Sequence, residues 1–163
     1  MAREDLPVTQ GIRTLRGLGI PYTPCTYQYE EHGGTSTAAR SLGVPEHEVI
    51  KTLVFCTDAG RPFLVLMHGD LEVSPKKLAR ELGVKHAELC DETAAQKHTG
   101  YVFGGTSPLG IRSVLPVLAE RTIFDLPSIL INAGKRGFLV RMDPKDLKKA
   151  FPIREVEVST GAV

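Results

Sequence analysis

The sequence has few cysteines, almost no net charge and no long hydrophobic run, and each absence excludes a class of protein. Its three cysteines, Cys25, Cys56 and Cys90, are spaced too widely for a zinc motif and are too few for a disulfide framework. Lysine and arginine (20) nearly balance aspartate and glutamate (19), which argues against a strongly basic nucleic-acid-binding protein. No apolar stretch approaches the roughly 20 residues of a membrane-spanning helix.

The histidines and the first residues argue against two further classes. Five scattered histidines include no HExxH pair, so we expect neither a metal nor a cofactor. The segment 1–10 carries acidic residues and a proline where a signal peptide would need an apolar stretch. We therefore expect reduced thiols, a cytoplasmic location and no membrane partner.

What the sequence does contain is typical of one globular domain over residues 1–163, with 42% hydrophobic and 24% charged residues. Helix signals lie within 7–18, 35–42, 74–82, 91–98 and 143–151, and strand signals lie within 22–29, 48–57, 62–69, 85–89, 113–118, 121–124, 128–131, 138–142 and 153–158. Thr35 or Ser36, Ser74, Asp91 and Asp143 are the expected helix caps. Because helices and strands do not alternate regularly, we predict an α+β fold with a mixed, mostly antiparallel sheet.

Lys51 is the first candidate for chemistry, because it lies in the apolar segment VIKTLVF and would share a strand face with Val49, Leu53 and Phe55. A lysine on such a face costs desolvation energy unless an anion meets it. A lysine near the start of a strand can also keep its ammonium in water and bury only its stem. The sequence favours this second, structural interpretation.

Two glycine-containing segments are the other candidates. The segment 100–110 (GYVFGGTSPLG) lets backbone N–H groups approach a ligand closely, although it matches no known phosphate-binding motif and a structural turn explains it equally well. The segment 132–137 (NAGKRG) places a Lys-Arg pair at a turn, where it would contact phosphates or simply be solvated.

No protein nucleophile is evident. Ser107 lacks the G-x-S-x-G elbow, and Cys56 is expected to be a small buried hydrophobe. Cys90 precedes a helix, which lowers a thiol pKa, but no histidine is evident beside it. The residues alone therefore predict an α+β domain with two glycine-bearing loops and one lysine worth testing.

Three segments together resemble the YbaK/EbsC family of aminoacyl-tRNA deacylases: 49–55 (VIKTLVF), 99–110 (TGYVFGGTSPLG) and 131–137 (INAGKRG). The resemblance extends from about residue 7 to 153. Within the family the chain is most similar to YbaK-type Cys-tRNA(Pro) deacylases, which are related to the editing domain of some prolyl-tRNA synthetases. The resemblance implies a mixed, partly barrel-like sheet flanked by helices.

The resemblance also implies a reaction and its partners. Enzymes of this type clear cysteine from tRNA(Pro), because a synthetase pocket discriminates poorly between side chains of similar size. The thiol of the substrate is thought to attack the ester carbonyl, so the protein needs only to position the ester and stabilise the oxyanion. The implied partners are the 3′ end of an aminoacyl-tRNA and, by association, prolyl-tRNA synthetase.

The site residues follow from the family motifs. Lys51 matches the required lysine, with Thr52 beside it, and Gly134 matches a glycine whose backbone N–H would face the reacting carbonyl. The remaining positions are expected to bind substrate or shape the pocket; they are Tyr27, Gly104, Gly105, Ser107, Pro108, Asn132, Ala133, Lys135 and Arg136.

The chain departs from the family at two places. Asn132-Ala133-Gly134 replaces Ser-Gly-Gly, so Ala133 is expected to narrow the pocket wall, and Gly34 replaces an aromatic residue found in some members. These changes leave two alternatives open. One is a deacylase for another small residue, such as alanine on tRNA(Pro), that uses water. The other is a tRNA-binding or nucleotide-binding module without turnover.

Overall fold

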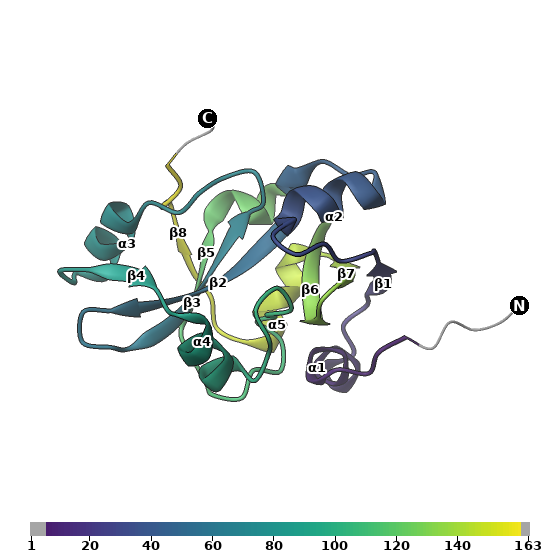
Figure 1. The fold of residues 1–163 in the computed structure, drawn as a ribbon, viewed down its shortest axis with the longest axis horizontal. Coiled ribbons are helices and arrows are strands. Elements are labelled where there is room, and N and C mark those ends of the chain that lie inside the picture. The colour runs from purple at the N-terminus through teal and green to yellow at the C-terminus, as the bar shows by residue number, and fades with distance from the viewer. Residues whose placement is uncertain (1–5, 161–163) are drawn as a thin grey trace, which may run out of the picture.

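The computed structural model describes residues 6–160, in which one eight-stranded mixed sheet is packed between helices (Figure 1). The strands are β1 (Thr23–Thr26), β2 (Val49–Thr57), β3 (Pro62–His68), β4 (Ala87–Leu89), β5 (Val117–Glu120), β6 (Ile129–Lys135), β7 (Phe138–Met142) and β8 (Arg154–Val156). The α-helices are α1 (Gln10–Leu18), α2 (Gly34–Leu42), α3 (Pro75–Leu82), α4 (Glu92–Thr99) and α5 (Leu147–Ala150). Three 3₁₀ helices, η1 (Glu46–Glu48), η2 (Arg121–Asp125) and η3 (Pro144–Asp146), complete the elements.

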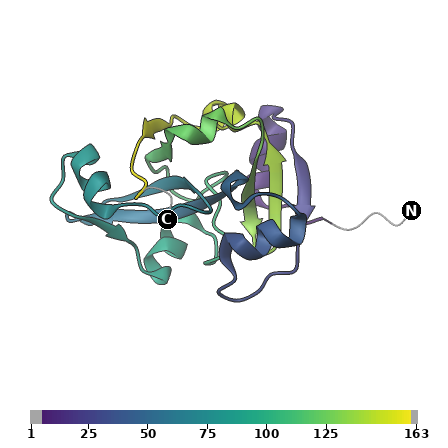
Figure 2. The ribbon, with the colours of Figure 1, turned by 90° about the horizontal axis from the view of Figure 1, so that it is seen from above.

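The strand order is β1-β7-β6-β2-β3-β5-β8, with β4 on the far half of β2. Four strand pairings are antiparallel and three are parallel, which confirms the predicted α+β class and mixed sheet. Within the described residues β1 and β8 end the sheet and do not pair with each other, so the sheet does not close into a barrel. Figure 2 shows the group β1, β7 and β6 turned steeply away from β2 and β3.

One edge of β2 is shared between two partners. The parallel strand β6 pairs only with Val49 and Ile50 at its start, and β4 pairs only with residues 55–57 at its end. The N–H of Cys90 also donates to the carbonyl of Val54. Residues 51–53 therefore have no strand partner on this edge in the described part of the chain, and this gap becomes one wall of the candidate site.

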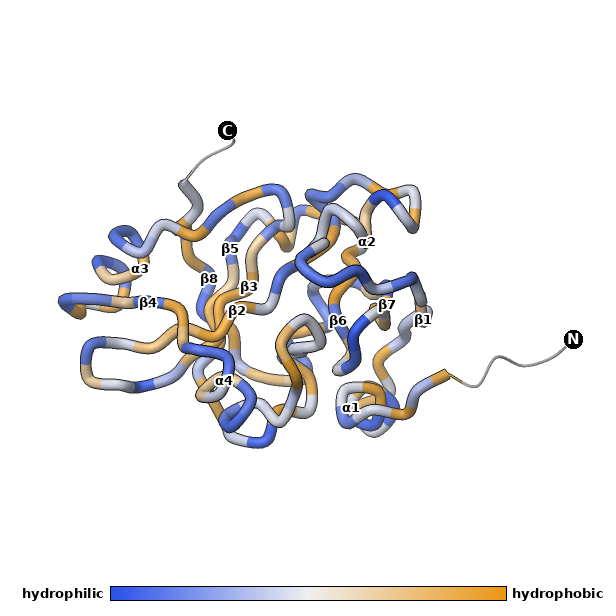
Figure 3. Tube along the Cα trace, viewed as in Figure 1, coloured by the Kyte–Doolittle hydropathy of each residue, from blue (hydrophilic) through white to orange (hydrophobic). Residues whose placement is uncertain are grey.

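Both faces of the central hairpin are buried. Leu64 and Leu66 of β3 join a cluster with α1, α5 and η2, whereas Val65 and Met67 join a second cluster with α3. A third, smaller cluster packs α2 against β2, β6 and β7. Figure 3 shows the corresponding hydrophobic colouring along β2 and β3. These strands therefore form a rigid frame from which the first residues of β2 are presented.

The predicted hairpin and most helix boundaries are confirmed. The Ser74 hydroxyl accepts a hydrogen bond from the N–H of Lys77 (3.2 Å) and opens α3, and the Asp91 carboxylate accepts one from Ala94 (2.7 Å) and opens α4. The predicted edge strand near the end of the chain is β8. No helix of the described residues is long and apolar enough to cross a membrane.

The expected cap of the second helix is wrong. Helix α2 begins after Gly33 without any side-chain cap, and neither Thr35 nor Ser36 fills that role. The Thr35 hydroxyl instead hydrogen-bonds Glu46 Oε2 (2.7 Å) and lies 3.2 Å from the carbonyl of Gly69. The Thr35 hydroxyl therefore makes a tertiary hydrogen bond and does not cap the helix that the local sequence suggested.

Four predictions after residue 112 also differ from the structure. The segment 121–125 is a 3₁₀ helix instead of a strand, and the last helix begins as a 3₁₀ turn at 144–146. Strand β5 begins only at Val117. Strand β6 continues through Asn132 to Lys135 with a register shift against β7, so the turn predicted over 132–137 is confined to residues 136–137.

Candidate active site

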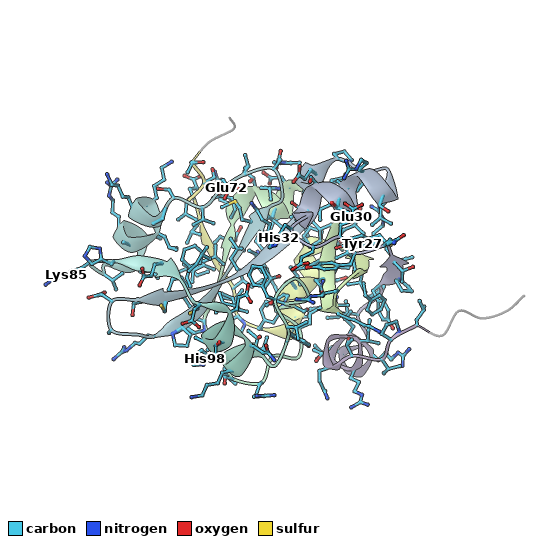
Figure 4. The ribbon with its side chains drawn as sticks, viewed as in Figure 1. Tyr27, Glu30, His32, Glu72, Lys85 and His98 are labelled. Carbon is cyan, nitrogen blue, oxygen red and sulfur yellow. The ribbon has the colours of Figure 1, made fainter. Side chains whose placement is uncertain are left out.

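A cavity of about 480 Å³ lies against the unpaired stretch of β2. Its other walls are the segment 27–35 between β1 and α2, the loop 103–106 and the start of the β6–β7 turn. Figure 4 labels Tyr27, Glu30 and His32 on the segment that leads from β1 into α2. The volume is within the range of small-ligand sites.

Lys51 lines this cavity, and its side chain is only 17% exposed. Its Nζ lies 3.4 Å from Oε1 of Glu72, a carboxylate that is 77% exposed on the loop after β3. Leu53 and Phe55, two and four residues later, belong to the apolar cluster on the same strand face. An ion pair with one strongly exposed partner is weak, so Glu72 holds the ammonium group of Lys51 only loosely.

Thr52 lines the cavity and has polar groups without a partner in the described structure. Its Oγ1 is buried and has no hydrogen-bond partner in the described structure. Backbone groups of a strand point alternately to its two edges, and Val54 turns its carbonyl toward Cys90. The N–H and C=O of Thr52, two residues earlier, therefore face the unpaired edge. A buried polar group without a partner costs about 1–3 kcal/mol, which a bound ligand would recover.

Asn132 ties two walls of the cavity together. Its Oδ1 accepts hydrogen bonds from the N–H groups of Gly134 (2.6 Å) and Lys135 (3.1 Å). Its Nδ2 donates to the carbonyls of Lys135 (3.1 Å) and Gly104 (3.3 Å). The Asn132 side chain therefore holds the β6–β7 turn against the 99–110 loop. The sequence did not indicate this role, because asparagine is common in turns for other reasons.

The 99–110 loop is closely packed against that turn. A Cβ on Gly105 would lie 3.0 Å from the backbone N of Arg136, and one on Gly104 would lie 2.8 Å from the Tyr29 hydroxyl. Gly104 also has φ +87°, a conformation that side chains rarely adopt. Both glycines are therefore needed for close approach, and Gly104 itself lines the cavity.

Two cysteines lie together away from the cavity lining. Burial and the neighbouring thiol of Cys56 raise the pKa of Cys90 to about 12, so this thiol is a poor nucleophile at neutral pH. No group of three or more histidine, cysteine or acidic side chains in the described residues is placed to hold a metal. The lining of the cavity likewise includes neither a cysteine nor a serine.

Comparison with known proteins identifies the family of this chain. The family model of the aminoacyl-tRNA editing domain matches residues 30–150. The chain belongs to this family. It is 28% identical over 153 residues to EbsC of Enterococcus faecalis, for which a Cys-tRNA(Pro)/Cys-tRNA(Cys) deacylase activity has been proposed, and the match covers 93% of each chain.

A longer protein and two crystal structures are also similar to this chain. The proline–tRNA ligase of Streptococcus equi subsp. equi is 34% identical over 122 residues, which are 73% of this chain and only 20% of the ligase. A crystal structure of a hypothetical protein has a TM-score of 0.84 at 21% identity, covering 93% of this chain and 99% of that one. A crystal structure named for proposed trans-editing with prolyl-tRNA synthetase has a TM-score of 0.78 at 20% identity, covering 95% and 100%. These two structures support the fold of the editing domain.

The cavity of this editing domain brings together half of the predicted site. The predicted residues that line it are Tyr27, Lys51, Thr52, Gly104, Asn132 and Arg136. Burial and the neighbouring Tyr29 raise the pKa of Tyr27, so its hydroxyl stays protonated at neutral pH.

The remaining predicted residues do not line the cavity. Ser107 and Pro108 are buried, and the Ser107 hydroxyl accepts a hydrogen bond from Leu109, so they shape the loop from behind. Lys135 is exposed, and Gly105 packs behind the wall.

Ala133 and Gly134 differ most from expectation. Ala133 is fully buried in the main core, and its carbonyl accepts a hydrogen bond from the Thr9 hydroxyl, so it does not narrow the cavity. The N–H of Gly134 is already donated to Asn132 instead of facing the cavity, and a Cβ there would lie 2.6 Å from the Tyr101 ring. In this editing domain Gly134 therefore supports the wall through Asn132 and Tyr101.

Sequence reasoning missed several lining residues, among them Tyr29, Thr35, Glu92 and Phe103. The β1–α2 segment and the start of α4 carry no motif that marks them. Phe103 had a weak signal, because a bulky aromatic residue within a run of glycines is unusual for a simple turn.

Proposed function

We propose that this chain is a deacylase that hydrolyses mischarged Cys-tRNA(Pro). The observation that carries the proposal is the cavity beside the unpaired edge of β2, which is lined by a largely buried lysine and by Thr52, whose hydroxyl has no partner in the described structure. Membership of the editing family and the similarity to EbsC support the reaction class and the cysteine substrate.

In the proposed reaction the substrate supplies the nucleophile. A few per cent of a thiol with a pKa near ~8.5 is ionised at neutral pH. The thiol first gives its proton to solvent, and the thiolate attacks the ester carbonyl. The bond between that carbon and the ribose oxygen then breaks, and the ribose oxygen takes a proton back from solvent to leave as a hydroxyl. The products are free tRNA and a cysteine thiolactone, which water then opens. The absence of cysteine and serine from the described cavity lining agrees with this route.

Lys51 and Thr52 would hold the ester and its developing charge. The Thr52 hydroxyl and backbone N–H are the donors available at the unpaired edge, and Lys51 releases Glu72 to meet the terminal phosphate or the ester. Loss of one such donor typically slows a reaction by roughly 10²–10³-fold. Gly104 and Tyr27 complete the walls that restrain the acyl group.

The near-zero net charge bears on the choice of tRNA. With 20 basic and 19 acidic residues, few phosphates can be neutralised by this chain alone. We therefore propose that association with prolyl-tRNA synthetase, in the cytoplasm, supplies selectivity for tRNA(Pro). Binding of tRNA by the isolated protein should then depend only weakly on salt, and adding the synthetase should increase deacylation of tRNA(Pro) over other tRNAs.

The decisive experiment is a deacylation panel with Cys-tRNA(Pro), Ala-tRNA(Pro) and Ser-tRNA. We expect rapid loss of cysteine, a decrease of about 10²-fold or more in Lys51→Ala, and normal activity in Lys76→Ala, which removes an exposed lysine on α3 outside the cavity. Methylating the substrate thiol should stop the reaction. Hydrolysis of the methylated substrate would instead assign a water nucleophile, and binding of tRNA without any loss of ester would refute the deacylase.

A further inference from the structure

Phe103 is an exposed aromatic ring at the cavity. It is 57% exposed, while the other five phenylalanines, all within the described residues, are buried or half-buried. It also contributes to the cavity lining, next to Gly104. An exposed aromatic ring at a cavity offers a flat apolar face on which a ligand can pack.

The backbone that carries this ring is fixed from both sides. Arg136 donates from Nε to the carbonyl of Phe103 (2.8 Å), and Asn132 donates from Nδ2 to the carbonyl of Gly104 (3.3 Å). Both donors come from the β6–β7 segment, which is held in the sheet. The position of Phe103 is therefore determined by tertiary contacts, although the ring itself remains open.

A cation lies beside the backbone that carries this ring, because Arg136 hydrogen-bonds the carbonyl of Phe103. The guanidinium of Arg136 is 5.2 Å from the centre of the Tyr29 ring, which holds its charge near the cavity. Lys135 is exposed in the same turn. An open aromatic face next to a fixed guanidinium is the combination that binds single-stranded nucleic acid, since bases stack on the ring and the cation meets a phosphate.

We propose that Phe103 is a stacking platform for a base in the unpaired 3′ end of the tRNA, with Arg136 contacting the adjoining phosphate. This inference rests on the proposed deacylase function and assigns the nucleotide side of that same site. The charge beside the ring favours RNA over an apolar protein segment as the occupant. Phe103 is thus a positioning residue, because it holds the substrate without touching the ester.

Stacking can be measured without any turnover. The probe is a short single-stranded RNA that ends in CCA, with the fluorescent base 2-aminopurine at the last or the penultimate position, since stacking quenches this fluorescence. We expect quenching by the wild type at one position, retained in Phe103→Tyr and lost in Phe103→Leu. Absence of quenching at both positions would overturn the proposal.

Kinetics test the same contact in turnover. For Phe103→Leu we expect kcat/KM on Cys-tRNA(Pro) to fall by about tenfold, mainly through KM, with cysteine methyl ester unaffected because it has no base to stack. Val102→Ala, a change at an exposed neighbour outside the cavity lining, should alter neither. Equal losses on both substrates would show that Phe103 only supports the fold.

The two proposals fail differently. A wild-type protein that quenches the probe but hydrolyses no ester contradicts the deacylase and keeps the platform. A protein that deacylates Cys-tRNA(Pro) equally well with leucine at 103 contradicts the platform and keeps the deacylase. If Phe103→Leu instead weakens co-purification with prolyl-tRNA synthetase and leaves RNA quenching intact, the ring is a protein contact and the proposal is wrong.

Discussion

Replacing Asn132 by alanine should weaken both the fold and the site, because this side chain joins two walls of the cavity. It is 9% exposed and makes four hydrogen bonds, accepting two from the β6–β7 turn and donating one to that turn and one to Gly104. Alanine removes all four. The N–H of Gly134, a half-buried residue, and the carbonyl of Gly104, an exposed residue at the cavity, lose their partner.

The size of the effect follows from the net value of such bonds. At roughly 0.5–1.5 kcal/mol each, four hydrogen bonds contribute about 2–5 kcal/mol when the long 3.3 Å contact to Gly104 is counted at the low end. For a chain of this size, about 3 kcal/mol corresponds to a decrease in Tm of roughly 6–12 °C.

The assay is thermal unfolding followed by deacylation of Cys-tRNA(Pro) at a temperature where both proteins are folded. We expect Asn132→Ala to lose most of its activity there, since the 99–110 loop is no longer tied to the turn. Asn132→Asp keeps the two acceptor contacts and loses the donors to the carbonyls of Gly104 and Lys135. It should therefore lower activity with a smaller decrease in Tm.

Gln96→Ala is the matched control, because it removes an exposed amide from α4 that makes no side-chain hydrogen bond within residues 6–160. Its Tm should stay within about 2 °C of the wild type. A folded, fully active Asn132→Ala protein with an unchanged Tm would refute the view that this amide organises the site.

Two further predictions concern a buried histidine and a packed glycine. Burial lowers the pKa of His68, which is fully buried and in its neutral form donates from Nδ1 to the carbonyl of His47 and accepts at Nε2 from Thr122. As the pH is lowered, the unfolded chain therefore takes up the proton first, so the free energy of unfolding should fall below about pH 6.5. Urea titrations at several pH values should show a flatter dependence for a His68→Gln variant. An equally steep dependence in the variant would assign the effect to other groups. Gly105→Ala would place a Cβ 3.0 Å from the backbone N of Arg136 and push the loop away, so KM for Cys-tRNA(Pro) should rise, whereas unchanged kinetics would show that the loop adapts.

Local signals were sufficient for much of the framework. The apolar segments around Lys51 and Leu64 predicted the β2–β3 hairpin, because both strands bury side chains on both faces. Ser74 and Asp91 predicted two helix starts, because capping depends on atoms only three residues away. These features need no knowledge of distant parts of the chain.

Other elements depended on contacts that local sequence does not contain. The segment 121–125 has strand-like residues, yet it forms a 3₁₀ helix whose Ile123 and Phe124 pack into the main core. Thr35 has a suitable side chain for a helix cap, but its hydroxyl donates a hydrogen bond to the carboxylate of Glu46 instead. In both cases packing and long-range hydrogen bonds outweigh a local preference of less than about 1 kcal/mol.

The features of the candidate site also fall into those that the sequence indicated and those that needed the tertiary structure. The sequence alone identified Lys51 and the two glycine-bearing segments, because a charge within an apolar strand and clustered glycines are unusual wherever they occur. Only the tertiary structure decided that Thr52 faces an unpaired strand edge, that the N–H of Gly134 is consumed by Asn132 and that Phe103 stays open beside Arg136. The physical reason is that a free donor or an uncovered ring depends on which distant segment fills the space next to it, and that is settled only when β4, β6 and the 99–110 loop have packed around β2.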